Sequence, residues 1–507
     1  MEAQEPLRVL FLAAEVVPFA KTGGLADVAG SLPKALKKLG VDVRVGMPRY
    51  GRIDREKFGL KTVLESFPVP MDDQTMEAGL LQGTIGEEVP VYMVENAHFY
   101  DREGIYMYPD DAERFIFFCR AILEAMKLLG WQPQVIHCHD WHTAIVPNWL
   151  KTIYKNDPFY KDTATLYTIH NLAYQGIFGY RVLEIAGIDE YGFIVHPEIP
   201  DLDNVVDMMG RGIYFADIIN TVSETYAQEI LTPEYGERLD PLLRDRRDRL
   251  FGVLNGIDPE VHNPATDPYI AARYDLHDLS GKAECKRALQ REAGLAEDPH
   301  IPLIGAISRL TDQKGFDLIA QIIDPLMQHT RLQFVLLGTG EQRYHDLFSQ
   351  IHERYPDRVA VFLTFNAPLA QKIYAGSDMF LMPSRFEPCG LGQLIAMRYG
   401  SIPIVRSTGG LADTVQDFDP VSGTGNGFAF QAYDPWALYG TIIRALENFK
   451  YRDTWRQLMV RVMSADYSWE ASARKYVDLY RRALASRLPR PPREVYRVGP
   501  GRGEDVA

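Results

Sequence analysis

The hexapeptide Thr-Gly-Gly-Leu-Ala-Asp occurs twice in this chain, at residues 22–27 and at residues 408–413. Each copy follows an apolar, strand-like run or its loop and precedes a stretch with helical periodicity. A single Gly-Gly pair is as readily a simple turn. Paired glycines before a helix, however, present free N–H groups and the positive end of the helix dipole, which favour an anion. Two such units far apart in the sequence predict two α/β domains that face each other.

The length of 507 residues is too great for one ordinary hydrophobic core and fits two α/β domains. We expect an N-terminal Rossmann-like domain over residues 1–258 and a second, donor-binding one over residues 259–468. A C-terminal helix over residues 469–486 is expected to return to the first domain. The last stretch, 487–507, is rich in Pro, Arg and Gly and lacks an apolar period, which predicts no ordered structure.

The formal net charge of −14 gives no electrostatic support for nucleic-acid binding or for an anionic membrane surface. Any anionic ligand must therefore be held by a local group of Lys and Arg. The acidic first eight residues are followed by six apolar ones, which predicts neither a signal peptide nor a membrane anchor. Four cysteines are too few for a disulfide framework. These features together predict a cytoplasmic protein.

The second half of the chain places charged residues after strand-like runs. Arg309 and Lys314 flank one loop, where both cations can reach a single diphosphate. The alternative is that they are solvated or matched with Asp312 and Glu341. Glu387 lies in a later loop of the same kind, and the second Gly-Gly pair follows the next strand. Since ligands bind beyond the carboxyl ends of parallel strands, a carboxylate near a phosphate seat predicts transfer chemistry.

In the first half, Lys21 stands directly before the first glycine pair, where its ammonium and backbone N–H groups could meet one anion. A solvated loop lysine is the alternative. The run His-Cys-His-Asp-Trp-His at residues 137–142 resembles a metal site. Because alternate side chains of a strand point to opposite faces, His137 and Cys138 are not expected to converge on one ion. We expect Asp140 to cap the helix that begins near residue 141 and His142 to face a ligand.

His170 follows another strand-like run and begins the sequence His-Asn-Leu-Ala-Tyr-Gln-Gly. Its imidazole, with the amides of Asn171 and Gln175, offers neutral hydrogen-bonding groups of the kind that recognise hydroxyls. A core histidine satisfied by backbone groups is the alternative for His170.

These motifs together identify a family. The chain resembles the bacterial glycogen synthases and the plant starch synthases, which are retaining glycosyltransferases. The resemblance covers about residues 7–484 and depends on motifs at residues 21–27, 139–142, 170–176, 253–258, 308–315, 383–391 and 408–413. It implies the α/β GT-B fold, in which two facing Rossmann-like domains enclose a deep cleft. The implied reaction transfers glucose from ADP-glucose to the nonreducing end of an α-1,4-glucan such as glycogen, with retention of configuration.

The resemblance also implies roles for individual residues. Catalytic roles fall to Glu387, which would support positive charge at the anomeric carbon, to Arg309 and Lys314 at the departing diphosphate, and to His170 beside the sugar. The other implied positions are those that bind the donor, namely Lys21, Gly24, Phe365, Cys389, Gly390, Leu391, Thr408, Gly409 and Gly410, and those on the acceptor side, namely Asp27, Asp140, His142, Asn171 and Gln175. No metal or other cofactor is implied.

Phe365 departs from the family pattern, which often has Tyr at this position, where the ring stacks on the nucleobase. Phe keeps the stacking face and loses the hydroxyl, so UDP-glucose stays open as the donor.

A related glycosyltransferase that acts on sucrose, trehalose or lipid acceptors is a rival function. A second rival is an α-glucan phosphorylase, which would need a lysine-bound pyridoxal phosphate. A catalytically silent glucan- or nucleotide-binding protein is disfavoured, because Lys21, Arg309, Lys314 and Glu387 are all present.

Overall fold

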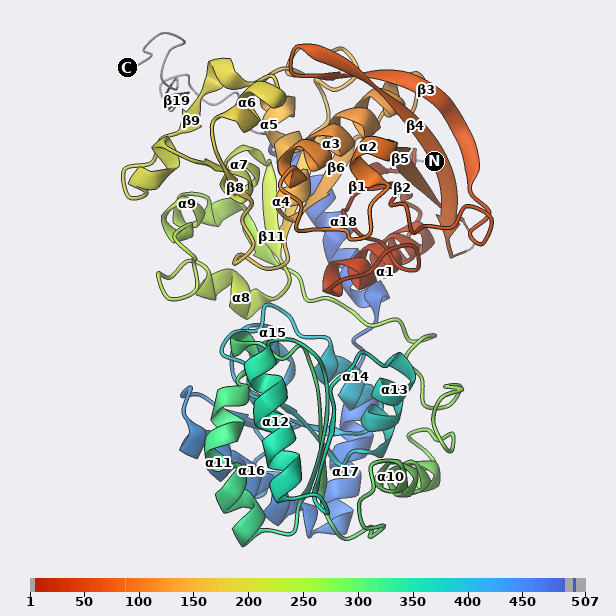
Figure 1. The fold of residues 1–507 in the computed structure, drawn as a ribbon, viewed down its shortest axis with the longest axis vertical. Helices are drawn as coiled ribbons and strands as arrows, with labels where there is room; N and C mark the ends of the chain where they lie inside the picture. The colour runs from red at the N-terminus through yellow and green to blue at the C-terminus, as the bar shows by residue number, and fades with distance from the viewer. Residues whose placement is uncertain (1–4, 87, 488–495, 498–507) are drawn as a thin grey trace. The chain divides into compact units, whose positions relative to one another are not determined.

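The computed structural model describes residues 5–86, 88–487 and 496–497. The chain forms two compact units, which are described separately (Figure 1). Unit 1 contains the described residues of Met1–Val222, Ala227–Leu254 and Trp469–Ala507, and unit 2 contains Ser223–Tyr226 and Asn255–Ser468. Both units are α/β, which confirms the predicted fold class.

The division between the units lies slightly earlier than residue 258, where the sequence placed it. Residues 255–258 belong to unit 2 because the backbone N–H of Ile257 donates to the carbonyl of Tyr467 at 2.8 Å. Ile257 also forms a parallel bridge with Ser468. The two segments in which the chain passes from one unit to the other, near residues 257 and 468, therefore contact each other inside unit 2.

Unit 1 is built on a nine-stranded sheet in the order β12-β11-β7-β6-β1-β2-β5-β4-β3. The strands from β12 to β5 are parallel, and β3 and β4 extend the sheet as an antiparallel hairpin. Their bounds are β1 (Arg8–Leu12), β2 (Asp42–Pro48), β3 (Lys61–Met71), β4 (Gln74–Ile85), β5 (Val89–Glu95), β6 (Val135–His139), β7 (Ala164–Ile169), β11 (Ile218–Thr221) and β12 (Leu250–Gly252).

Unit 2 contains a six-stranded parallel sheet in the order β15-β14-β13-β16-β17-β18. Numbered within the unit, this is the order 3-2-1-4-5-6 of doubly wound nucleotide-binding folds. The strands are β13 (Leu303–Ile307), β14 (Gln333–Leu337), β15 (Val359–Phe362), β16 (Met379–Met382), β17 (Ile402–Arg406) and β18 (Phe428–Phe430).

Each sheet has a point where the strand order reverses, between β1 and β6 in unit 1 and between β13 and β16 in unit 2. In doubly wound folds, ligands bind beyond the carboxyl ends of the strands at such a reversal point. The central strands are almost wholly buried, as is usual when helices cover both faces of a parallel sheet. Strand order therefore decides which loops can build a site.

Helices cover both faces of the unit 1 sheet. α1 and α18 pack against each other and against the strands on one face, whereas α3, α4, α5 and α7 form a second layer. The helices of this part of the chain are α1 (Gly24–Lys38), α2 (Ala97–Tyr100), α3 (Asp111–Leu128), α4 (Asp140–Thr143), α5 (Ile145–Lys151), α6 (Arg181–Ile185), α7 (Met208–Phe215), α8 (Glu224–Glu229), α9 (Asp240–Asp245) and α18 (Trp469–Ala485).

In unit 2, α11, α12 and α16 pack on one face of the sheet and α10 and α13 on the other (Figure 1). Each layer closes its own hydrophobic cluster against the strands. The helices are α10 (Ser280–Glu292), α11 (Phe316–His329), α12 (Gln342–Arg354), α13 (Ala367–Gly376), α14 (Gly392–Arg398), α15 (Gly409–Thr414), α16 (Pro435–Phe449) and α17 (Arg452–Ser464).

The C-terminal helix α18 belongs to unit 1, although it follows the whole of unit 2 in the sequence (Figure 1). Its buried Tyr480 hydroxyl lies 2.9 Å from Nδ1 of His137 on β6. The other ring nitrogen of His137 lies 2.7 Å from the hydroxyl of Thr168, which itself donates to Asn220. Because the Thr168 proton is used, His137 donates from Nε2 and accepts the Tyr480 proton at Nδ1. Tyr480 therefore joins α18 to the centre of the sheet.

The last segment of the chain is in part ordered. Tyr496–Arg497 forms β19, which pairs antiparallel with β9 (Phe193–Ile194). The expectation that residues 487–507 lack structure is wrong for these two residues, since two backbone segments can pair without an apolar period. Residues 488–495 and 498–507 lie outside the described residues. Across the described residues, no helix is long and apolar enough to cross a membrane.

We predict that Tyr480→Phe lowers the free energy of unfolding by about 1–3 kcal/mol, because Nδ1 of the fully buried His137 loses its donor. Urea unfolding followed by circular dichroism measures the change. Tyr451→Phe is the control, since Tyr451 is 68% exposed, and should stay within about 0.5 kcal/mol of the wild type. Equal stability of Tyr480→Phe and the control would contradict this account of α18.

Candidate active site

Glu15, just beyond β1, holds the loop that contains Lys21 and the first glycine pair. Its side chain accepts hydrogen bonds from the backbone N–H groups of Thr22 and Gly23 and from the hydroxyl of Tyr106. Burial raises the pKa of Glu15, and the two backbone donors partly offset that shift. The anion that the N–H groups of Thr22 and Gly23 bind is therefore the carboxylate of Glu15. The prediction that these N–H groups are free for a ligand is wrong in this structure.

Lys21 and Asp27 form an ion pair at the start of α1, with 2.6 Å between Nζ and Oδ1. Both side chains are more than a third exposed, so the pair is accessible to a ligand and contributes little to stability. Gly24 is the first residue of α1. The structure thus brings Lys21, Gly24 and Asp27 together at one helix N-terminus.

Asp140 connects the loops that follow β6 and β7. Its Oδ1 accepts a hydrogen bond from the backbone N–H of His170 at 2.8 Å, and its φ of 54° lies in the left-handed region. Burial raises the pKa of Asp140 to about 7, and the nearby Glu15 carboxylate also raises it. The expected helix cap is not formed, because α4 has His139 at its N-cap and no side-chain cap. The carboxylate has turned to the neighbouring loop instead.

His170 is half-buried and uses Nε2 to contact Nδ1 of His139, at 2.9 Å. Burial lowers the pKa of His170 to about 3, so its ring is neutral at physiological pH. His142 lies deeper, because its ring packs against Tyr106, Phe115 and Trp141. The pKa of His142 is also lowered by burial to about 3.

Asn171 and Gln175 both make contacts inside unit 1. Oδ1 of Asn171 accepts from the backbone N–H of Ala173 at 3.1 Å. Gln175 is buried, and its amide donates to the carbonyl of Glu237 at 2.8 Å. Asn171 therefore shapes the loop after β7, and Gln175 ties that loop to a distant segment.

Arg309 and Lys314 lie on the connection between β13 and α11, at the reversal point of unit 2. The alternative partners Asp312 and Glu341 are both bound to Arg343. Arg309 is exposed, and its guanidinium makes no ion pair or hydrogen bond with any residue that the structure describes. A cation without a protein partner at this position is available to an anionic ligand.

Glu387 lies on the loop between β16 and α14 and binds Lys314 across the reversal point. Oε2 of Glu387 is 2.6 Å from Nζ of Lys314 and 2.9 Å from the hydroxyl of Ser384, which donates to it. The Glu387 side chain is 8% exposed and that of Lys314 is 15% exposed. Two largely desolvated opposite charges therefore stabilise each other at the reversal point of unit 2.

The second glycine pair packs directly on the Glu387 loop. Gly409 has a φ of 47°, and a Cβ atom there would collide with the carbonyl oxygen of Glu387. A Cβ on Gly410 would collide with the carbonyl of Cys389, and the Gly410 N–H donates to the Glu387 carbonyl at 3.1 Å. Only glycine permits this approach, so residues 408–410 fix the backbone that presents Glu387.

The other residues that were predicted to bind the donor lie on neighbouring connections of unit 2. Cys389 is buried, which raises the pKa of its thiol to about 12. Gly390 has a φ of 73°, and Leu391 is the N-cap of α14. Thr408 is buried at the N-cap of α15. Phe365 follows β15 and is 81% exposed, so its ring has an open face.

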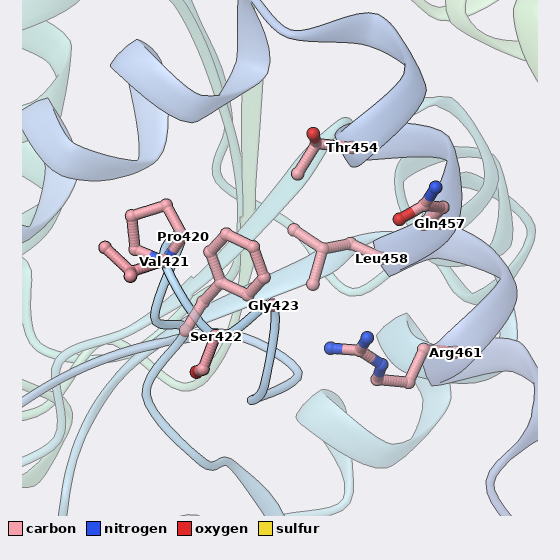
Figure 2. Close-up of a pocket in the computed structure, with 9 residues that line it drawn as sticks. Pro420, Val421, Ser422, Gly423, Thr454, Gln457, Leu458 and Arg461 are labelled. Carbon is pink, nitrogen blue, oxygen red and sulfur yellow. The ribbon is translucent and has the colours of Figure 1, made fainter.

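A separate pocket of about 220 Å³ lies elsewhere in unit 2, between the loop around Gly423 and helix α17. Figure 2 shows Thr454, Gln457, Leu458 and Arg461 on one side and the loop on the other. None of the predicted site residues lines it. Within the part of the chain that the structure describes, no group of three or more His, Cys, Asp or Glu residues could hold a metal ion.

Three residues that build these sites were not predicted from the sequence, namely Glu15, His139 and Ser384. Glu15 could have been suspected, because it is a lone carboxylate at the end of an apolar run. Ser384 and His139 act through partners that only the fold brings near, so the sequence contains no local signal for them.

We predict that Gly409→Ala costs more than about 3 kcal/mol, since the new methyl group meets backbone rather than a movable side chain. Gly423→Ala is the matched control. Gly423 has a similar positive φ of 70° but no atom within 4 Å of the added Cβ, so only the backbone strain of about 1–2 kcal/mol applies. Thermal unfolding compares the two variants. Equal losses would show that the close approach to Glu387 does not matter.

Two family models match the chain. The model described as the starch synthase catalytic domain covers residues 8–245, and that described as glycosyl transferases group 1 covers residues 289–458. The chain is 51% identical to a glycogen synthase of Moorella thermoacetica over 486 residues, which is 95% of this chain and 98% of the relative. It is 48% identical to a glycogen synthase of Thermotoga petrophila, with coverage of 94% and 99%.

A solved structure agrees with these relatives. The catalytic domain of starch synthase IV from Arabidopsis thaliana, bound to ADP and acarbose, superimposes with a TM-score of 0.87 at 37% identity. The match covers 95% of this chain and 100% of that one. The resemblance inferred from the motifs is thereby confirmed: the chain belongs to the glycogen and starch synthase family of glycosyltransferases, which has the GT-B fold.

Proposed function

We propose that the protein is a glycogen synthase that transfers glucose from ADP-glucose to the nonreducing end of an α-1,4-glucan, with retention of configuration. The observation that carries the proposal is the group formed by Arg309, Lys314 and Glu387 at the reversal point of unit 2. It combines two cations with a buried carboxylate at the place where such folds bind nucleotides.

The charges of this group suit glucosyl transfer. As the bond between glucose and diphosphate breaks, the sugar gains positive charge and the diphosphate gains negative charge. Fixed groups of opposite sign stabilise such a change because they need no reorganisation during the reaction. We assign Arg309 and Lys314 to the diphosphate and Glu387 to the sugar.

The ion pair between Lys314 and Glu387 sets a condition for donor binding. Without a donor, each of these charges is neutralised by the other at 2.6 Å. A diphosphate that binds Lys314 must share it with Glu387 or displace it. In return, the Glu387 carboxylate is released toward the sugar, which is the group whose charge changes in the reaction.

For unit 1 we propose that Lys21 and Gly24 contact the donor phosphates and that His170 lies beside the reacting sugar. Asp27, Asp140, His142, Asn171 and Gln175 are assigned to the acceptor side. The hydrogen bond from His170 N–H to Asp140 supports a shared role for these two residues. Exposure of the Lys21–Asp27 pair supports access by a ligand.

ADP-glucose is proposed as the donor because the similar starch synthase was solved with ADP bound. The exposed Phe365 ring offers a stacking face, and we assign it to the base. Stacking alone discriminates little between adenine and uracil, so UDP-glucose is the second candidate. We also propose that the protein is cytoplasmic, a location supported by four free, buried cysteines.

Incorporation of labelled glucose into glycogen from ADP-glucose and, in parallel, UDP-glucose tests the proposal. We predict incorporation mainly from ADP-glucose. Glu387→Gln should lower the rate by about a hundredfold to a thousandfold, because the amide cannot stabilise positive charge on the sugar.

Glu341→Gln is the matched control, since Glu341 is an acidic residue of the same unit that pairs with Arg343. It should keep the wild-type rate. Incorporation mainly from UDP-glucose would change the donor assignment. Failure of the folded protein with both donors, or full activity of Glu387→Gln, would contradict the proposed function.

A further inference from the structure

The imidazoles of His139 and His170 meet where β6 and β7 end. Nδ1 of His139 lies 2.9 Å from Nε2 of His170, and the ring centroids are 5.2 Å apart. Burial lowers the pKa of both rings, and the neighbouring His137 and His170 lower the pKa of His139 further. Two neutral imidazoles share one hydrogen bond only if one nitrogen carries the proton and the other accepts it.

The surroundings of His139 decide which nitrogen is the donor. Its side chain is fully buried, and Nε2 has no hydrogen-bond partner among the residues that the structure describes. The ring packs against Phe11 and His137, with centroid distances of 4.1 Å to each. The Phe11 ring has no polar atom with which Nε2 could form a hydrogen bond.

His137 cannot supply the missing partner, because Tyr480 and Thr168 occupy both of its nitrogens. If His139 carried its proton on Nε2, a buried N–H group would be left without an acceptor, which proteins rarely tolerate. With the proton on Nδ1, the unpaired atom Nε2 is an acceptor, which costs less to leave unpaired than a buried N–H. The contact with His170 then becomes a normal hydrogen bond.

We infer that His139 is a positioning residue: its Nδ1–H donates to Nε2 of His170 and thereby fixes the proton of the neutral His170 ring on Nδ1. His170 then presents an N–H donor, and not a lone pair, on the side of the ring that faces away from His139. The inference rests on the proposed function only for its consequence, which is that this N–H donates to a hydroxyl oxygen of the sugar.

Two contacts then orient His170 independently. Asp140 accepts its backbone N–H at 2.8 Å and His139 binds its ring at 2.9 Å. The first fixes the position of the main chain, and the second fixes both the rotation of the ring and its tautomer. Loss of the second contact should therefore leave the fold intact and change only what His170 offers to a ligand.

The test compares His139→Asn with His139→Leu. The side-chain amide nitrogen of Asn is attached to the γ carbon, as Nδ1 of histidine is, so His139→Asn can still donate to His170. His139→Leu fills the apolar space without a donor. Thermal melts followed by circular dichroism establish that each variant is folded.

The first readout is the ¹⁵N spectrum of protein labelled at its histidine rings, with the His170 signals identified by their loss in His170→Gln. We predict a protonated Nδ1 and an unprotonated Nε2 for His170 in the wild type and in His139→Asn. In His139→Leu the proton should redistribute to Nε2. This readout does not require any enzymatic activity.

The second readout is glucosyl transfer. His139→Leu should lower kcat by about ten- to a hundredfold, as is usual when the group that orients a functional imidazole is removed, and should change KM little. His139→Asn should restore most of the rate. A merely structural role would predict equal losses in the two variants.

A wild-type His170 that is protonated on Nε2 would overturn the inference, even if the Leu variant does not fold. An unchanged tautomer in His139→Leu would overturn it as well. If the tautomers behave as predicted and the wild type transfers no glucose, the positioning contact holds and the proposed function fails, so the two conclusions are separable.

Discussion

The ion pair of Lys314 and Glu387 is the interaction on which the site in unit 2 depends. Both side chains are largely withdrawn from water, and either charge alone would be costly at that depth. Each comes from a different loop, so the pair holds the loops after β13 and β16 together at the reversal point. Ser384 adds a hydrogen bond, and Gly409 lets a third loop pack on the backbone of Glu387. These contacts thus fix both charges in the region proposed to bind the donor.

In unit 1, too, carboxylates hold loops in place, but they bind backbone N–H groups. There a buried carboxylate, Glu15, binds the backbone of the Lys21 loop, and Asp140 binds the backbone of the loop that begins with His170. In unit 2 the Glu387 carboxylate joins the loops on the two sides of the reversal point, whereas in unit 1 Asp140 joins the loops after β6 and β7 and Glu15 holds its own loop. Two cations remain accessible, Lys21 with its exposed partner and Arg309 with no partner among the described residues, and both suit an incoming phosphate. The arrangement explains how an acidic chain can offer local sites to an anionic donor.

Sequence patterns predicted the parts that local rules govern. Apolar runs indicated the strands that precede the loops of Arg309, Glu387 and His170, and the repeated hexapeptide indicated two loops at helix starts, α1 and α15. The sequence did not predict the partners of these loops. Asp140 was expected to cap its own helix, yet it binds His170, because the order of strands places β7 beside β6. Glu15 replaces the expected ligand at Thr22 and Gly23 through a local contact, since it lies in the same loop between β1 and α1. The contact of Asp140, by contrast, depends on which loops meet, and no short-range pattern encodes that.

The most direct test of whether the donor diphosphate displaces Glu387 from Lys314 is the affinity for ADP, measured by calorimetry in the wild type and in Glu387→Gln. If Glu387 competes with the diphosphate for Lys314, the neutral variant should bind ADP about tenfold more tightly, which corresponds to about 1.4 kcal/mol. Glu341→Gln, which leaves the Lys314–Glu387 pair intact, should bind like the wild type. Equal or weaker binding of ADP by Glu387→Gln would contradict the account, because the internal carboxylate would then not be the group that the donor displaces.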